Sequence, residues 1–162
     1  MAFMKLVIVM MVLAGVAAAQ CTVADAPAVR GLTLGMKRKA FMAHFPGTDP
    51  INMFDRDELS RVRGFAGLER LIFRINNDNL QLDQLELHYA GLSGGLDRLT
   101  LRITKELKLP HDAWKPEADK LEMRCLTFRI TADPATNGFT ITDLAGEKYW
   151  IEMKEAAERG RN

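Results

Sequence analysis

Two consecutive runs of alternating apolar and polar residues constrain the fold of this chain more than any other feature. The first run covers residues 68–75 and the second covers residues 80–89. Between them, residues 76–79 read Asn-Asn-Asp-Asn, side chains that tolerate the left-handed backbone of a tight turn. The apolar residues change sides within the second run, which indicates a β-bulge near Asp83-Gln84. The two runs together predict a β-hairpin.

Apolar residues at helical spacing recur in three further segments, residues 36–45, 96–107 and 144–159. Asp143 is expected to cap the last of these helices. Residues 121–131 and 139–144 alternate and predict a second hairpin. Residues 48–66 carry mixed charge without a clear period and are expected to be a loop with room for one helical turn. Trp114-Lys115-Pro116 is expected to begin another loop.

The expected order of elements is therefore helix, hairpin, helix, hairpin, helix. The simplest way to bury these apolar stripes is an α+β fold, with an antiparallel sheet of about four strands and helices packed on one face. Residues 20–162 have the length of a single domain.

The first nineteen residues have the pattern of a secretory signal peptide. Lys5 precedes an apolar stretch over residues 6–16, and Ala17-Ala18-Ala19 fits the small-residue cleavage site. The alternative is a membrane anchor, but the stretch is shorter than the roughly 20 residues that span a bilayer. We therefore expect cleavage after Ala19 and a soluble protein exported to the periplasm or the extracellular space.

The chain has two cysteines, Cys21 and Cys125. Exported proteins are located in an oxidising compartment, so the two cysteines predict a disulfide. The alternative is a buried Cys125 thiol and an idle Cys21 near a frayed terminus. Lipidation of Cys21 would bring the protein to a membrane, but the bulky Gln20 fits a lipoprotein cleavage site poorly.

Composition and motifs argue against several classes of function. Twenty-two basic residues against 21 acidic ones give no basic excess for a nucleic-acid partner. Residues 91–95 read Gly-Leu-Ser-Gly-Gly, which we interpret as a strand-to-helix turn, and no Lys-Ser or Lys-Thr follows to complete a phosphate-binding loop. His44, His88 and His111 lack the spacing of zinc ligands. We expect no catalytic residue, no metal and no cofactor.

The expected partner surface lies on the polar side of the first hairpin. Arg70, Arg74, Glu86 and His88 fall on that side, and Trp114 adds an aromatic residue in a loop. Trp114 has the alternative role of a lid folded onto the core. These residues favour a non-enzymatic protein that binds another protein.

Two other functions remain open at this point. A small-ligand-binding protein or enzyme would have a pocket between sheet and helices, in which His88 and Glu86 converge with Asp119 or Asp143. An inhibitor of a secreted enzyme would bind through a protruding loop such as residues 48–66.

Residues 30–36 read Arg-Gly-Leu-Thr-Leu-Gly-Met, with Ala26-Pro27 before them and Phe-Pro-Gly at residues 45–47. This pattern resembles a group of small exported bacterial proteins without an assigned activity. It is also weakly similar to BamE-type outer-membrane assembly lipoproteins and to β-lactamase-inhibitor-like proteins. The resemblance implies helices on one face of an antiparallel sheet and a function in binding other proteins. Lys37 stands where Ser or Thr usually caps the following helix, and no functional residue is transferred.

Overall fold

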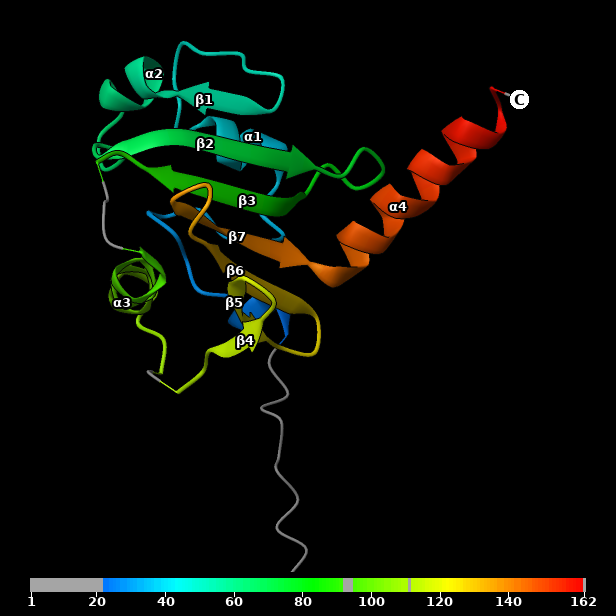
Figure 1. The fold of residues 1–162 in the computed structure, drawn as a ribbon. Helices are drawn as coiled ribbons and strands as arrows, with labels where there is room; N and C mark the ends of the chain where they lie inside the picture. Colours follow the sequence, from blue (N-terminus) through cyan, green and yellow to red (C-terminus); the bar gives the residue numbers. More distant parts are fainter. Residues whose placement is uncertain (1–21, 92–94, 111, 162) are drawn as a thin grey trace, which may run out of the picture.

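The computed structural model describes residues 22–91, 95–110 and 112–161. Its strands are β1 (Met53–Asp55), β2 (Leu68–Ile75), β3 (Leu82–Tyr89), β4 (Lys115–Glu117), β5 (Lys120–Arg124), β6 (Phe128–Asp133) and β7 (Gly138–Asp143). Its helices are the 3-10 turn η1 (Val23–Asp25) and the α-helices α1 (Arg38–Met42), α2 (Arg56–Ser60), α3 (Gly95–Leu107) and α4 (Leu144–Arg159). These strands form one antiparallel sheet in the order β1-β2-β3-β7-β6-β5-β4 (Figure 1).

The predicted sheet of about four strands is wrong, because the described residues form a sheet of seven. The segment expected to be one strand over residues 121–131 is two strands, β5 and β6. Buried or half-buried apolar residues alternate up to Cys125 and resume at Phe128, one position out of phase. The intervening turn exposes Leu126 and accounts for the change of phase.

The expectation for residues 48–66 is wrong in one respect, because the segment contains the strand β1; the five-residue helix α2 corresponds to the helical turn for which the expected loop had room. Asp55 caps α2 through a capping box, in which its side chain accepts a hydrogen bond from the Glu58 backbone and Glu58 accepts one from the Asp55 backbone. At the opposite edge, residues 115–117 form β4 rather than a loop. Pro116 has no backbone N–H to donate. Proline is tolerated in an edge strand, because one side of such a strand has no neighbouring strand to bond.

The first hairpin and its bulge are confirmed by β2 and β3. Arg74 pairs with Gln84, and the next residue, Ile75, pairs with Leu82. Asp83 is therefore the extra residue of the bulge. In a regular strand, adjacent side chains point to opposite faces of the sheet. Leu82 and Asp83 are adjacent and both buried, so the bulge places the acidic side chain of Asp83 in a buried position that regular alternation would not give.

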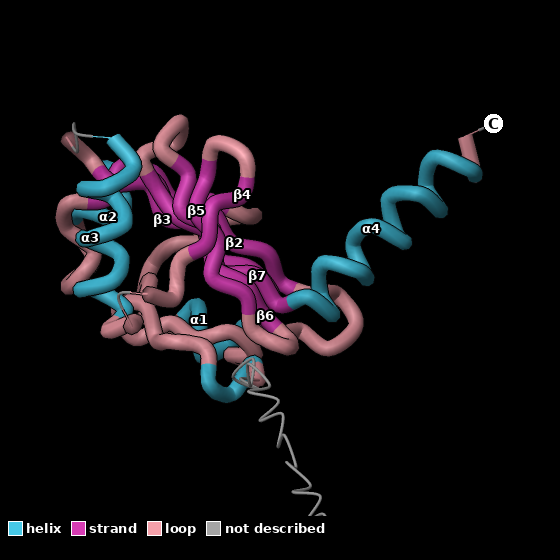
Figure 2. Tube along the Cα trace, turned by 60° about the horizontal axis from the view of Figure 1, so that its bottom comes forward, coloured by secondary structure: helices cyan, strands magenta, loops and turns pink. Residues whose placement is uncertain are grey.

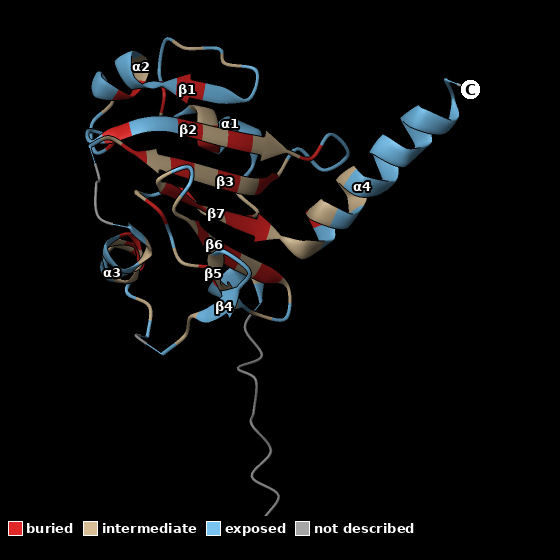
Figure 3. Cartoon of the chain, in the orientation of Figure 1, coloured by how far each residue is buried: buried red, intermediate tan, exposed pale blue. Residues whose placement is uncertain are grey.

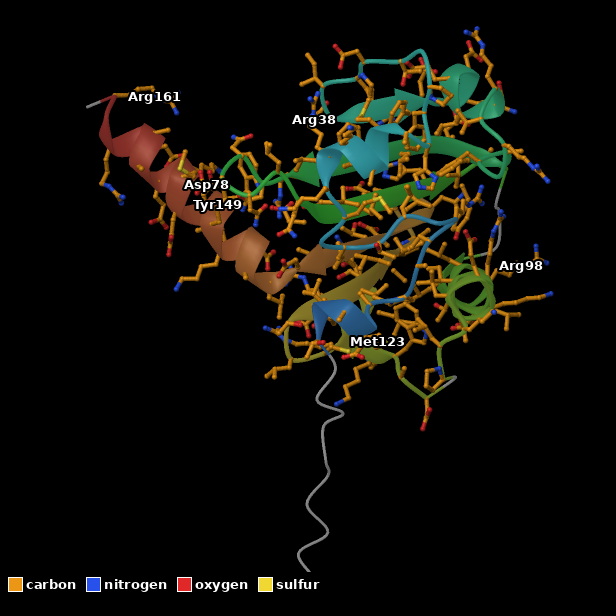
Figure 4. The ribbon with its side chains drawn as sticks, turned by 180° about the vertical axis from the view of Figure 1, so that it is seen from behind. Arg38, Asp78, Arg98, Met123, Tyr149 and Arg161 are labelled. Carbon is orange, nitrogen blue, oxygen red and sulfur yellow. The ribbon has the colours of Figure 1, made fainter. Side chains whose placement is uncertain are left out.

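The core lies between one face of the sheet and the elements that cover it. Figure 3 shows buried residues along the central strands, and Figure 4 shows the N-terminal segment and α1 crossing this covered face. Helix α3 packs here as well, with Leu99, Ile103 and Leu107 buried. Five phenylalanine rings pack together here, with Phe41 and Phe45 from the α1 region against Phe54 and Phe73 from the sheet, and Phe65 against Phe45.

The segment that carries the Arg-Gly-Leu-Thr-Leu-Gly-Met motif is part of this core. Val29 and Leu32 exchange two backbone hydrogen bonds around Arg30 and Gly31, whose φ angles are 54° and 89°. Positive φ at both central residues is the geometry of a type I′ turn. The Gly35 amide then donates to the Leu82 carbonyl. The motif therefore has a structural role, which is to fix the N-terminal segment across the start of β3.

Helix α4 departs from the expectation that the helices pack on one face. Asp143 caps it as predicted, with its side chain accepting from the Ala145 backbone. The helix then leaves the end of β7 and projects away from the rest of the fold (Figure 2). Residues 151–161 are all exposed.

Candidate binding face

The side of the sheet opposite the core has no described helix across its centre (Figure 1), and we call it the open face. The strand register places charged, amide and hydroxyl side chains side by side on it. In β2 and β3, Arg70 lies opposite His88 and Arg74 opposite Gln84. The row continues through the register pairs Glu86–Thr140, Thr140–Thr131 and Thr131–Glu122. The open face is thus a broad polar surface built from five strands.

The structure brings Arg70, Arg74, Glu86 and His88 together on this face, as the sequence predicts. His88 Nε2 lies 2.5 Å from Glu86 Oε1, with side chains 14% and 23% exposed. Arg70 is exposed next to this pair and has no ion pair within the described ranges. The fixed His88–Glu86 pair and the adjacent Arg70 offer both an acceptor and donors to an incoming group.

Arg74 has a different role, because it holds α4 to the sheet. Its Nε donates to Asp83 Oδ1 at 2.8 Å, and Trp150 Nε1 donates to Asp83 Oδ2 at 2.7 Å. The Arg74 guanidinium also lies 5.5 Å from the centre of the Trp150 ring. Burial raises the pKa of Asp83 above its ordinary value, although the hydrogen bonds from Arg74 and Trp150 oppose the rise.

Gly146 completes this junction. A Cβ atom built at Gly146 would lie 2.4 Å from the Cβ of Asp83, closer than side chains can pack. Tyr149, one turn further on, donates to Asp78 Oδ1 at 3.2 Å across to the β2–β3 turn, and Figure 4 shows the two side chains together. The first turns of α4 are therefore fixed to the hairpin.

Trp114 does not lie with the other predicted partner residues. It is half-buried against the core, and its Nε1 donates to Thr104 Oγ1 of α3 at 2.8 Å. This is the position of a lid between α3 and the β4–β5 edge, on the covered side of the sheet.

Of the side chains expected to converge in the pocket of the enzyme alternative, the structure joins His88 and Glu86 and separates Asp143 from them. Asp143 caps α4 at one end of β7, whereas Gly138, at the other end, is the residue opposite His88. Five residues of extended chain place Asp143 about 17 Å from that end. No hydrogen bond or ion pair joins Asp119 to His88 or Glu86 within the described residues. In the same part of the chain no three His, Cys, Asp or Glu side chains gather to hold a metal ion.

A groove of about 680 Å³ lies at the base of α4, and we call it the α4 groove. Apolar side chains of the β1 approach, β2, the hairpin turn and α4 line it, among them Ile51, Ile72, Leu80 and Trp150. Its charged lining residues are Arg38 and Arg74, with no acidic residue. The groove is therefore mainly apolar, because Arg38 is ion-paired with Asp49 at 3.6 Å and Arg74 with Asp83 at 2.8 Å.

The sequence did not indicate the Asp83–Trp150–Gly146 junction. Trp150 reads as one more apolar residue of the last helix, and Asp83 reads as a solvated strand residue. The sequence did contain one signal of this junction, which is the change in the alternation of apolar residues at Asp83. A bulge changes the direction of the side chain at that position.

No protein-family model, curated protein sequence or solved structure matches this chain. The resemblance to small exported bacterial proteins and to BamE-type proteins therefore stays a prediction. The site is interpreted from its geometry alone.

Two sequence predictions concern residues at or before the start of the described chain. The signal peptide over residues 1–19 and Cys21 lie outside the described residues, so the Cys21–Cys125 disulfide stays a prediction. Across residues 22–91, 95–110 and 112–161, no helix combines the length and the apolar character needed to cross a membrane.

Proposed function

We propose that this protein is an exported, non-enzymatic binding protein that recognises another protein through the open face of its sheet. The observation that carries this proposal is the open face itself. It is broad, it lacks a covering helix among the described elements, and several of its charged side chains are held in fixed pairs. Protein interfaces that form and dissociate are about as polar as ordinary surface, so a polar face is suited to such binding.

The centre of the proposed contact is Arg70 with the His88–Glu86 pair. The planar guanidinium of Arg70 can bind a carboxylate with two hydrogen bonds. The neighbouring threonines, Thr140 and Thr131, supply hydroxyl groups that both donate and accept. The face thus suits a partner whose contact surface presents carboxylates opposite Arg70, flanked by backbone or amide groups.

Substitution of Arg74 does not test this contact alone, although Arg74 lies on the same face. Its guanidinium anchors α4 through Asp83, so its replacement changes the position of the helix as well as the surface charge. Arg70 makes no such anchor and is the residue to change.

Site-specific photo-crosslinking in the native cells tests the proposal. A photoreactive residue is placed at Arg70 and at Thr131 on the open face, and at the exposed Lys105 of α3 as the control. We expect an adduct of the same mass from the two open-face positions and none from position 105. Absence of adducts from the open face, or equal adducts from all three positions, would refute the assignment.

Export and the disulfide are tested by the intact mass of the protein from fractionated cells, before and after reduction and alkylation. We expect the mass of residues 20–162 less two hydrogens, and its increase by two alkyl groups only after reduction. A chain that starts at a lipid-modified Cys21 would contradict both the soluble location and the disulfide.

A further inference from the structure

We infer that His88 makes recognition at the open face depend on pH, so that the protein binds its partner more tightly when His88 carries an extra proton. This inference rests on the proposed function, because it concerns the same face and the same partner, with carboxylates opposite Arg70. Two observations carry it, namely the chemistry of the His88–Glu86 pair and the position of this pair next to Arg70.

The His88–Glu86 pair determines the role of each nitrogen of the imidazole ring. An ionised carboxylate can only accept hydrogen bonds, so the hydrogen of the neutral ring lies on Nε2, the atom that contacts Glu86 Oε1. The other nitrogen, Nδ1, makes no hydrogen bond within the described residues. A proton from solvent therefore binds at Nδ1 and changes it from a hydrogen-bond acceptor to a donor.

The strand register fixes the charged groups that face His88. Glu86 lies two residues earlier on β3, and Arg70 lies opposite on β2. On the other side, Gly138 of β7 brings no side chain. The remaining charged side chains of this row lie further out: Asp55 on β1 opposite Arg70, and Asp133 on β6 with its ion-pair partner Lys120 on β5. Imidazole is the side chain that ordinarily titrates between pH 5 and 8, so among these described groups His88 is the one whose charge changes there.

The direction of the effect follows from this arrangement. Protonation of His88 adds one positive charge beside Arg70, and a partner carboxylate then meets a second charged donor at Nδ1. Loss of the proton removes this donor and leaves the negative charge of Glu86 unbalanced by the ring. A partner that prefers the protonated form must also favour proton uptake when it binds, because the two equilibria are linked. Binding should therefore strengthen as the pH falls.

The affinity of the partner that crosslinks to the open face, measured as a function of pH, tests the inference. Isothermal titration calorimetry gives Kd at about pH 5.5, 6.5 and 7.5, which cover the titration of imidazole. We expect Kd at the lowest pH to be at least about threefold smaller than at the highest, the size of effect that one charge has at a partly exposed contact. Repeating the titration in buffers of different ionisation enthalpy should show net proton uptake on binding.

Three variants separate His88 from titrating groups on the partner. His88→Gln keeps an amide donor for Glu86 but has no charge at any pH, so Kd should lose its pH dependence. His44→Gln is the matched control, because His44 lies just after α1, against Gly31, on the covered side of the sheet (Figure 4), and should keep the full pH dependence. Glu86→Gln removes the opposing carboxylate and should tighten binding at the highest pH.

The outcomes distinguish this inference from the proposed function. A wild-type Kd that does not change with pH, or that rises as the pH falls, would overturn the inference and leave recognition by the open face intact. The same holds if His88→Gln keeps the pH dependence of the wild type, or if Glu86→Gln weakens binding at the highest pH. If no open-face position gives a crosslinked adduct, the proposed function is wrong and this inference is wrong with it.

Discussion

Arg30 connects three parts of the chain, and its removal is the most quantitative test of how this fold is held. Its Nε donates to Glu106 Oε1 at 2.9 Å, and its Nη1 donates to the carbonyls of Gly64 and Ala66 at 2.9 and 3.1 Å. Tyr89 OH donates to the second oxygen of Glu106 at 2.7 Å. The Arg30 side chain is only 13% exposed, so these contacts are largely shielded from water.

Arg30→Met keeps much of the apolar side chain and removes the charge and the donors. Breaking a fully buried ion pair costs about 3–5 kcal/mol, and partial exposure of Arg30 and Glu106 places this one near the lower end. We expect the free energy of unfolding to fall by about 3 kcal/mol, which lowers Tm by about 10 °C for a domain of this size. Urea titration followed by far-UV circular dichroism measures the change.

Two further variants make this prediction specific. Arg63→Met, in the loop whose carbonyls Arg30 binds, changes an exposed side chain and should cost less than about 0.5 kcal/mol. Combining Arg30→Met with Glu106→Gln should cost at least about 1 kcal/mol less than the sum of the two single changes, because they remove the same contact. If Arg30→Met costs no more than Arg63→Met, or if the double variant is additive, the Arg30 contacts do not hold the fold as described.

Two further expectations concern Tyr89 and Gly146. Burial, and then the hydrogen bond to a carboxylate, raise the pKa of Tyr89 above its ordinary value of 10.0, so the unfolded chain releases this proton at a lower pH than the folded one. Stability should therefore fall above pH 10 by about 1.4 kcal/mol per pH unit, and Tyr89→Phe should remove that slope from a pH series of urea titrations. Gly146→Ala should destabilise the protein by about 1–3 kcal/mol through its clash with Asp83, although alanine favours helices. Gly160→Ala at the C-cap of the same helix meets only an ordinary contact at 3.6 Å and should be neutral in thermal denaturation, and equal effects at both glycines would refute the packing argument.

Elements with a strong local pattern were predictable from the sequence, and short edge elements were not. The β2–β3 hairpin, α3 and α4 each combine a regular apolar period with a turn or a cap, and the structure contains all three. Strands β1 and β4 are three residues long, and β4 has no buried residue, so neither leaves a period to detect. Their pairing depends on neighbouring strands rather than on local sequence.

The position of α2 had a sharper sequence signal than the single helical turn allowed within residues 48–66. Asp55 and Glu58 have the spacing of a capping box, which predicts the start of α2, whereas the mixed charge around them suggested a solvated loop. The turn between β5 and β6 was also visible, since the apolar alternation changes phase between Cys125 and Phe128.

The open-face residues were predictable for a simple reason. Alternation along a hairpin places Arg70, Glu86 and His88 on the side opposite the core, whatever the rest of the sheet does. The role of Arg74 was not predictable, because it depends on a bulge at Asp83 and on a helix that begins 70 residues later in the chain. Trp114 illustrates the same limit, since only the packing of α3 decides which side of the sheet it reaches.

The affinity of the partner identified by crosslinking, measured for wild type, Arg70→Glu and the Lys105→Glu control, tests the central claim most directly. An interfacial charge reversed against carboxylates should cost at least about 1.4 kcal/mol, which is tenfold in Kd. We predict that Arg70→Glu weakens binding tenfold or more with an unchanged Tm, and that Lys105→Glu leaves Kd unchanged. Equal affinities for all three proteins would contradict recognition through the open face of the sheet.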